Sequence, residues 1–309
     1  MNDAKRLVTA IIVTFNRREL LERCLKAIAN QTNKPQQVLI IDNASTDGTQ
    51  EWVEDWLVEH IPQGRLSKLD SNIGGAGGFA HGMEIAMDGR CDWVWMMDDD
   101  AEPCPDALEQ LLNEPLDTSN IYSSAAVSGE NLAWPIIPSS STCGPLLRSS
   151  DLRPVMEVSS VPFLGILISA EIIKKIGYPD AGYFFQFDDV EYCLRSRKAG
   201  ASIIIIGSSR INHPLATRYP VKILGKTLYT FRMRPWKRYY YVRNRILLAK
   251  KHFGLSAYYN TVPASFFRLI GTLIYEPNRV LQTWATIAGV WDGLWGRKGQ
   301  RHKHWGLRA

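Results

Sequence analysis

The chain lacks most features of secreted, disulfide-bonded or membrane-spanning proteins. Its cysteines are odd in number and show no short paired spacing, at positions 24, 91, 104, 143 and 193. This argues against a disulfide scaffold or a structural zinc site and fits a reducing compartment. The N-terminus has no apolar core followed by a small-residue cleavage site, so we expect no signal peptide. No segment is expected to span a membrane, because the most apolar ones are interrupted at Arg268, Glu276, Pro277, Arg279 and Asp292.

Acidic residues are scarce in the last third of the chain. The 309 residues are 45% apolar and 22% charged, which is ordinary for one large globular domain with or without an appendage. Residues 211–309 contain 18 Lys and Arg but only two acids, a net charge of +16, whereas residues 1–210 carry −11. We therefore expect the two parts to have different roles.

The glycine-rich stretch NIGGAGGFAHG, residues 72–82, lacks the signatures of common nucleotide-binding loops. It has no Lys-Ser/Thr pair of a P-loop, and it follows the third expected strand rather than the first. A flexible backbone before a helix still lets N–H groups approach an anion closely. The stretch therefore indicates close approach to a ligand or to another segment.

Strand-like and helix-like segments alternate along the first hundred residues. The expected strands are residues 7–15, 37–41, 66–69 and 93–97, and the expected helices are residues 17–30, 50–58 and 79–87. This alternation predicts an α/β fold with a parallel, doubly wound sheet. Asn16, Asp42, Asn72 and Asp98 would then lie just past strand ends, along one edge of the sheet.

Periodicity is weak from residue 113 to 158, a region rich in Ser, Pro and Asn, where we expect loops with short strands. Order returns with a strand in residues 161–169, a short helix after it, and a strand that ends near residue 212. Residues 235–253 form a basic helix with proline in its first turn, and residues 256–295 are helical as well.

Three consecutive aspartates, Asp98 to Asp100, follow the apolar strand WVWMM. Adjacent carboxylates repel one another unless a cation or hydrogen-bond donors lie among them. The triplet is either a solvated acidic loop or a metal site at the carboxyl end of a strand, where open α/β sheets bind ligands. His213, after a later strand, is a candidate third ligand, although a single histidine is often structural. Mg²⁺ and Mn²⁺ accept such a mixed set.

A second acidic cluster opens a helix in the segment FDDVEY, with Asp188, Asp189 and Glu191. The helix dipole stabilises negative charge there, and simple N-capping is the alternative reading. An N-cap needs neither a second adjacent acid nor the phenylalanine-rich sequence FFQF that precedes these residues. One of these aspartates is therefore a candidate general base.

Five motifs, in this order, resemble those of family 2 glycosyltransferases of the GT-A fold: TAIIVTFNR, VLIIDNASTDGT, NIGGAGGF, the strand-terminal DDD and FFQFDDVEYCLR. They span residues 7–213 with the late histidine. The resemblance implies a catalytic domain at residues 1–220, with a nucleotide-sugar part at 1–112 and an acceptor part at 113–220. A basic, aromatic-rich helical region at residues 221–309 would follow it.

The resemblance also implies roles for donor-side residues. Thr14, Phe15, Asn16 and Arg17 would line the nucleotide pocket, and Asp42 would hydrogen-bond the uracil or thymine ring.

The diphosphate and metal would lie between two further motifs. Asn72 and the glycine backbone around Gly75 would border the diphosphate and the sugar. Asp98 and Asp100 match the ends of an Asp-x-Asp element that binds donor and metal, and His213 would complete a Mn²⁺ or Mg²⁺ site.

On the acceptor side, Asp189 matches the catalytic base, and Asp188 and Glu191 would hold acceptor hydroxyls or the geometry of the base. A metal acting as Lewis acid would neutralise the leaving diphosphate. One base opposite the leaving group implies inversion, unlike glycoside hydrolysis, which needs a second carboxylic acid.

The donor sugar is less defined by the motifs. The glycine stretch and the DDVEYCLR segment resemble galactofuranosyl and rhamnosyl transferases of bacterial cell-surface polysaccharides, including O-antigen and cell wall. We expect UDP-galactofuranose, with dTDP-rhamnose as the alternative. A sugar-nucleotide nucleotidyltransferase is a third reading, but TFNRREL lacks that class's glycine-rich loop. A non-catalytic glycan-binding or lipid-binding module would need neither two acid clusters nor the histidine.

The basic C-terminal third is either a helical extension with a solvated basic face or a membrane-surface element. Lys and Arg would meet anionic lipids while Trp and Tyr settle at the interface. We expect peripheral association with the cytoplasmic face of the inner membrane, because acceptors in this family are commonly lipid-linked glycans. A nucleic-acid partner is not expected. The oligomeric state stays open.

Overall fold

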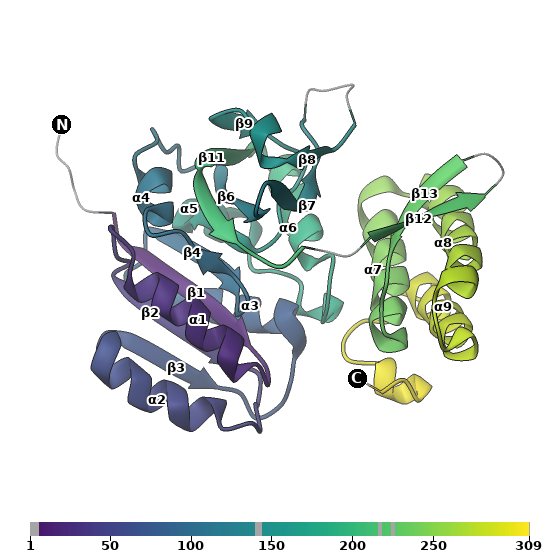
Figure 1. The fold of residues 1–309 in the computed structure, drawn as a ribbon, viewed down its shortest axis with the longest axis horizontal. Coiled ribbons are helices and arrows are strands. Elements are labelled where there is room, and N and C mark those ends of the chain that lie inside the picture. The colour runs from purple at the N-terminus through teal and green to yellow at the C-terminus, as the bar shows by residue number, and fades with distance from the viewer. Residues whose placement is uncertain (1–5, 140–143, 216–217, 224–225, 309) are drawn as a thin grey trace.

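The computed structural model describes residues 6–139, 144–215, 218–223 and 226–308, so Cys143 lies outside the described residues. It shows a sheet domain with helices on both faces, followed by a helical unit beside it (Figure 1). The predicted boundary at residue 220 falls within the hairpin β12 (Arg218–Ile223) and β13 (Lys226–Phe231) that leads into this unit.

The central sheet has the order β3-β2-β1-β4-β10-β6-β11-β5. Its strands are β1 (Val8–Thr14), β2 (Gln37–Asp42), β3 (Gly64–Lys68), β4 (Trp93–Asp98), β5 (Glu102–Pro103), β6 (Ile121–Ser128), β10 (Leu164–Ser169) and β11 (Ile203–Asn212). The four strands β3, β2, β1 and β4 run parallel to one another, and β6 runs parallel to β11. Strand β10 runs antiparallel to both of its neighbours, β4 and β6. Short strands β7 (Asn131–Ile136), β8 (Leu146–Arg148) and β9 (Val155–Glu157) extend the sheet.

Helices cover both faces of the sheet because its strands are apolar on both sides. In β1, Ala10 and Ile12 belong to one buried cluster while Ile11 and Val13 belong to the other. The first face is covered by α1 (Arg18–Ala29), α2 (Thr49–His60) and α4 (Ala107–Leu112). The second face is covered by α3 (Gly74–Asp88), α5 (Ala170–Ile176) and α6 (Asp188–Lys198).

The predicted strand–helix alternation and the mostly parallel sheet are confirmed. The loops and short strands expected at residues 113–158 are present as β7, β8 and β9, but the region also contains a longer strand inside the sheet that was not expected. The polar-looking sequence IYSSAAVS forms β6, an eight-residue strand between β10 and β11. Ser123 and Ser124 are buried, and the Ser124 hydroxyl hydrogen-bonds that of Ser209 at 2.7 Å. Because a buried hydroxyl with a partner loses little on leaving water, a serine-rich segment can occupy the middle of a sheet.

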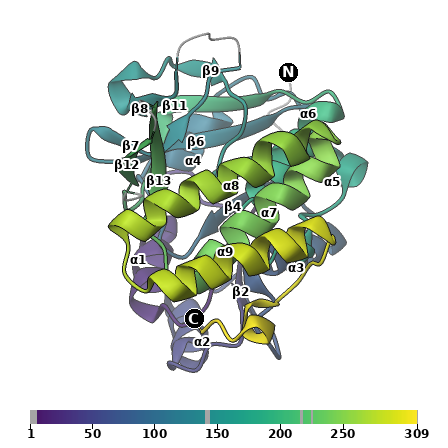
Figure 2. The same ribbon diagram turned by 90° about the vertical axis from the view of Figure 1, so that its right-hand side faces the viewer.

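The C-terminal unit consists of the hairpin, α7 (Pro235–Phe253), α8 (Ser256–Tyr275), α9 (Arg279–Leu294) and a short 3₁₀ turn, η3 (His302–Trp305). The helical region expected at residues 256–295 is thus two helices with a break at 276–278. α7 lies nearest the sheet domain, and α8 and α9 lie side by side beyond it (Figures 1 and 2). No helix in the described part of the chain is long and apolar enough to cross a bilayer.

The two acids of this basic unit are both internal. Glu276 Oε1 accepts from Arg238 Nη2 at 2.6 Å, which joins α7 to the α8–α9 turn. Asp292 Oδ2 accepts from the Tyr239 hydroxyl at 2.7 Å and from Trp305 Nε1 at 2.8 Å. Charges this well buried persist only when paired and hydrogen-bonded, so the scarce acids hold the helices together.

Gly74 and Gly75 offer a matched test of packing at the start of α3. A Cβ on Gly74, whose φ is +80°, would lie 2.0 Å from the Phe184 carbonyl oxygen, whereas nothing lies within 4 Å of one on Gly75. Gly74→Ala is expected to lower the free energy of unfolding by about 2–4 kcal/mol through overpacking and a left-handed backbone. Gly75→Ala should change it by less than about 1 kcal/mol. Urea denaturation of both variants measures this, and equal losses would contradict the packing of Gly74 against Phe184.

Candidate active site

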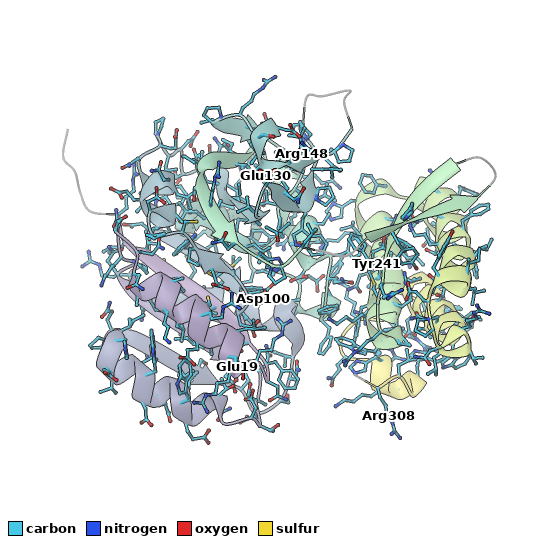
Figure 3. The ribbon with its side chains drawn as sticks, in the orientation of Figure 1. Glu19, Asp100, Glu130, Arg148, Tyr241 and Arg308 are labelled. Atoms are coloured by element: carbon cyan, nitrogen blue, oxygen red, sulfur yellow. The ribbon has the colours of Figure 1, made fainter. Side chains whose placement is uncertain are left out.

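The carboxyl ends of β1, β2 and β4 form one edge of the sheet, called here the carboxyl edge. Strand register places Thr14 beside Asp42 and Val13 beside Asp98. Asp100, just after β4, lies on the side of the domain that faces the helical unit (Figure 3). The sequence prediction that strand-end polar residues share one edge is thereby explained by the parallel register.

Asp99, to which the sequence assigned no role, is the buried member of the aspartate triplet. It is 3% exposed, and its Oδ2 accepts from the Thr14 hydroxyl at 2.9 Å. Arg17 Nη1 donates to Asp99 Oδ1 at 2.8 Å and to Asp100 Oδ2 at 2.9 Å. Burial raises the pKa of Asp99 to about 6 despite the opposing charge of Arg17. Asp99 therefore anchors the triplet to β1. Thr14 and Arg17 act as hydrogen-bond donors to the aspartates in this structure.

Asp100 and His213 meet at the carboxyl edge, with Oδ1 and Nε2 separated by 3.2 Å. His213 Nδ1 lies 2.8 Å from the Pro214 carbonyl oxygen, which can only accept, so Nδ1 carries the hydrogen. In the neutral ring Nε2 then directs a lone pair at a carboxylate. Both atoms are then available as ligands to a cation. Burial acts to raise the pKa of Asp100, but His213 and Arg17 outweigh it and lower that pKa below its usual range.

Asp98 connects the two acidic clusters. Its pKa is raised by burial and by the charges of Asp100, Asp99 and Asp188. Asp188 is the first residue of α6 and is far from Asp98 in the sequence. The two clusters predicted separately from the sequence thus share one electrostatic environment.

The donor set at the carboxyl edge fits a hard divalent cation. Among the residues that the structure describes, no three His, Cys, Asp or Glu side chains are already gathered as a metal cage. Asp100 and His213 are in contact, and Asp98 is close enough for the charge of Asp100 to raise its pKa. Mg²⁺ and Mn²⁺ are commonly held by few protein donors, with the remaining positions filled by water and substrate phosphates.

Asp42 and Asn16 organise the loops beside β1 and β2. Asp42 is fully buried, and its Oδ2 accepts from the Ser45 N–H at 2.9 Å and from Gln50 Nε2 at 2.5 Å. Its Oδ1 is buried without a hydrogen-bond partner among the described residues. Asn16, at φ +51°, accepts from the Thr46 N–H at 2.7 Å. A free buried acceptor is what a ring N–H of uracil or thymine would satisfy.

The start of α3 presents backbone N–H groups at this edge. Asn72 Oδ1 accepts from the Gly74 N–H at 2.8 Å, and Asn43, which the sequence did not single out, accepts from the Ile73 N–H at 3.3 Å. The first N–H groups of a helix have no partner within the helix. Gly75 faces open space, so an anion can approach here. Phe15, 40% exposed, lies at the end of β1 on the same edge.

The acids of α6 divide between two environments. Burial raises the pKa of Asp189 to about 6, and burial together with Asp189 raises that of Asp188 to about 7. Glu191 is fully buried and pairs with Lys251 Nζ at 2.7 Å and with Arg195 Nη2 at 3.1 Å. Of the two roles predicted for Glu191, these contacts favour support of the geometry of the base over binding of acceptor hydroxyls.

Several residues of α7 reach this site, although the sequence suggested only a basic helix. Arg243 and Asn244 are fully buried against the segment that leads into α6. The Lys237 ammonium lies 5.2 Å from the centre of the Phe185 ring, and burial together with the charge of Arg17 lowers its pKa. The spacing of basic residues along a helix does not reveal which of them are buried, and only the packing does.

Solved structures share this architecture. The chain aligns with GalNAc-T7, solved with UDP, GalNAc and Mn²⁺, at a TM-score of 0.62 and 11% identity over 99% of this chain and 59% of that one. It aligns with a mannosyltransferase from Pyrobaculum calidifontis, solved with GDP-Man and Mn²⁺, at a TM-score of 0.54 and 18% identity over 95% of this chain and 89% of that one. The fold is the GT-A fold of glycosyltransferases.

Residues 9–143 match the family described as glycosyl transferase family 2. Galactofuranosyltransferase GlfT1 of Mycolicibacterium smegmatis is 30% identical over 256 residues, 77% of this chain and 82% of the relative. An N-acetylglucosaminyl-diphospho-decaprenol L-rhamnosyltransferase of Mycobacterium tuberculosis is 26% identical over 243 residues, 67% of this chain and 76% of that protein. The chain belongs to glycosyltransferase family 2 and is a glycosyltransferase.

Proposed function

We propose that this glycosyltransferase transfers galactofuranose from UDP-galactofuranose, with inversion and with Mn²⁺ or Mg²⁺, to a lipid-linked bacterial polysaccharide acceptor. The observation that carries the proposal is the contact of 3.2 Å between Asp100 Oδ1 and His213 Nε2 at the carboxyl edge, in a domain whose α6 begins with a second group of acids. One cluster is partnered by a histidine and an arginine, as a donor and metal side requires. The other supplies carboxylates of raised pKa, as a general base requires.

On the donor side, Asp98, Asp100 and His213 would hold the cation, which when bound neutralises charge on the leaving diphosphate. Arg17 keeps Asp100 in place through its bond to Oδ2. The N–H groups at the start of α3, near Asn72 and Gly75, approach the diphosphate from the other side. Asp42, whose Oδ1 has no hydrogen-bond partner among the described residues, is assigned to the N3–H of the nucleobase.

On the acceptor side, Asp189 removes the proton from the attacking hydroxyl. A pKa of about 6 keeps this carboxylate ionised near neutral pH and makes it a stronger base than an ordinary aspartate. With one base opposite the leaving group, the hydroxyl attacks in line and the anomeric configuration inverts. Asp188 and Glu191 maintain the position of the base.

Similarity supports galactofuranose over rhamnose as the donor sugar. The GlfT1 relative is 30% identical over 77% of this chain, compared with 26% over 67% for the rhamnosyltransferase. dTDP-rhamnose stays the alternative, because thymine and uracil present the same N3–H to Asp42. The nucleotidyltransferase reading is wrong, since the chain belongs to a glycosyltransferase family.

The outer sides of α8 and α9 support the proposed membrane association. Their exposed side chains recur at spacings of three and four residues and are large and apolar, which is unusual for a face open to water. They are Tyr259, Phe266, Phe267, Ile270, Ile274 and Tyr275 along α8, and Val280, Leu281, Trp284, Ile287, Trp291 and Trp295 along and just after α9. The two helices lie side by side on one face (Figure 2). With Arg279 and Arg297 exposed near its ends, this outer face suits the interface of an anionic bilayer.

Asp189→Asn and Asp100→Ala are expected to separate the two sides of the site. Asp189→Asn should lower transfer at least about 10²-fold because the base is lost, while Mn²⁺ and UDP-galactofuranose still raise the melting temperature. Asp100→Ala, or EDTA, should abolish that rise. Transfer and thermal shift are measured with UDP-galactofuranose and, in parallel, dTDP-rhamnose.

The exposed Asp55→Asn of α2 is the control for both variants and should match the wild type. Undiminished transfer by Asp189→Asn would remove the assignment of the base. A donor-induced shift that persists in EDTA would remove the metal.

The rate of transfer is expected to depend on deprotonation of the carboxyls at the start of α6, Asp189 with a pKa of about 6 and Asp188 with a pKa of about 7. The base acts only when ionised, so kcat should be high at neutral pH and fall as the pH drops through the raised pKa of about 6 of Asp189. With an aspartate of ordinary pKa, kcat would stay nearly unchanged down to about pH 5. The measurement is kcat against pH at saturating donor, with circular dichroism showing that the protein stays folded. A constant kcat down to about pH 5 would contradict the assignment.

Binding to lipid vesicles tests the outer face of α8 and α9. The wild type should float with vesicles of phosphatidylglycerol and phosphatidylcholine, less so at high salt. The double variant Trp291→Ser, Trp295→Ser should bind at least about tenfold more weakly, because two large aromatic side chains no longer enter the interface. Val58→Ser, at a 78% exposed apolar site on α2, is the control and should float normally. Unchanged flotation of the double variant would show that this face does not bind lipid.

A further inference from the structure

The segment that leads into α6 has an unfavourable backbone. Phe184, Gln186 and Phe187 have φ values of +64°, +66° and +67°, in the left-handed region that residues other than glycine rarely adopt. Phe187 directly precedes Asp188 and Asp189, so its conformation sets where their carboxylates point. Such strain persists only when surrounding contacts impose it. The question is which contacts hold residues 184–187.

Two adjacent side chains of α7 hold this segment by its carbonyl groups. Asn244 Nδ2 lies within hydrogen-bond distance of three carbonyl oxygens and shares its two hydrogens among them: Tyr183 at 3.0 Å, Phe185 at 2.8 Å and Gln186 at 2.8 Å. Arg243 Nη2 donates to Tyr183 at 2.7 Å. Both side chains are fully buried. The carbonyls that the strained turns leave without helix or sheet partners are therefore satisfied from the C-terminal unit.

Arg243 and Asn244 are themselves fixed in place. Arg243 Nε donates to Asn244 Oδ1 at 2.8 Å, which orients the amide so that its NH₂ faces the carbonyls. The Arg243 guanidinium lies 4.6 Å from the centre of the Tyr240 ring, and its Nη1 donates to the Gly299 carbonyl at 2.6 Å. We call these two residues the Arg-Asn clamp.

The opposite side of the segment is bounded by the start of α3. Gly74 lies so close to the Phe184 carbonyl that a Cβ would be 2.0 Å from its oxygen. The segment is thus enclosed between the glycine turn on the donor side and the clamp on α7. Neither the sheet domain nor the C-terminal unit alone encloses it.

We propose that the Arg-Asn clamp positions the acids of α6 for catalysis, so that the C-terminal unit completes the active site in addition to any membrane role. This inference rests on the proposed function of Asp189 as the base. Arg243 and Asn244 do not contact substrate in this assignment; they act through residues 184–187. Loosening the clamp should misplace the base while leaving the donor side intact, and small misplacements of a catalytic group cost rate steeply.

Two buried arginines of α7 provide a matched experiment. Arg238 is 2% exposed and bonds to Thr230, the Phe231 carbonyl and Glu276, none of which belongs to the α6 approach. Arg243→Lys and Arg238→Lys remove the same fork of donors from the same helix. Arg243→Lys is expected to lower kcat by about 10- to 100-fold with the donor KM and the donor-induced thermal shift within about threefold of wild type. Arg238→Lys should lower the melting temperature with little change in kcat.

The assay uses whichever of UDP-galactofuranose and dTDP-rhamnose the wild type turns over, so an error in the donor sugar leaves the test intact. Asn244→Ser, a milder loss of donors, repeats the comparison if Arg243→Lys does not fold and should show the same fall in kcat. Equal kcat losses in Arg243→Lys and Arg238→Lys would overturn the positioning role. Loss of folding in both clamp variants, with Arg238→Lys folded, would also overturn it.

Asp189→Asn is measured in the same series to separate the two hypotheses. If Asp189→Asn is inactive and the clamp variants are fully active, the base assignment stands and the clamp proposal fails. If Asp189→Asn retains full activity, the base assignment fails and the clamp proposal falls with it.

Discussion

Electrostatic repulsion among carboxylates at the carboxyl edge is the constraint on which the rest of the site depends. Asp98, Asp99 and Asp100 leave a buried strand together, and Asp188 adds to their field from α6. Two of them have compensating partners: Thr14 and Arg17 bond Asp99, while Arg17 and His213 bond Asp100. Burial and the neighbouring carboxylates still raise the pKa of Asp98 well above its usual range. The remaining cost is one that a bound divalent cation would offset, because a nearby positive charge favours the ionised carboxylate.

Rigid apolar strands make this concentration of charge possible. Trp95 and Met97 of β4 are fully buried between helices, and so are Ala10 and Ile12 of β1. Such packing prevents the strand ends from separating to relieve the repulsion. In the C-terminal unit the signs of the charges are exchanged. Basic residues are in excess there, and two buried acids, Glu276 and Asp292, form ion pairs with arginines.

What could be predicted from the sequence followed from local rules. Alternating apolar strands and amphipathic helices indicated the sheet, and parallel strand ends indicated which polar residues share an edge. The strand β6 was missed because a serine-rich sequence suggests a solvent-exposed loop. The hydrogen bond between Ser124 and Ser209, which allows burial, joins residues far apart in the sequence. The role of Asp99 was missed because its partners, Thr14 and Arg17, are 85 and 82 residues away in the sequence.

The same limit applies to the Arg-Asn clamp. Its hydrogen bonds join residues 58–61 positions apart, and they satisfy backbone carbonyls, which leave no trace in side-chain composition. The sequence RYYYVRNR indicates a basic helix, but three-dimensional packing decides that Arg238 and Arg243 are buried while Arg279 and Arg297 are exposed. The number of basic residues in the sequence therefore overestimates how many of them are exposed to solvent or available to lipid in this unit.

α7 is the element that joins the outer face to the chemistry. One part of it packs against α8 and α9, whose apolar sides face outward, and another part carries the clamp that holds the approach to α6 (Figures 1 and 2). Near its start, Lys237 is influenced by the charges of Arg17 and Asp100 at the carboxyl edge. α7 therefore lies between the outer face, which we propose meets lipid, and the acids of α6, which we propose the clamp positions.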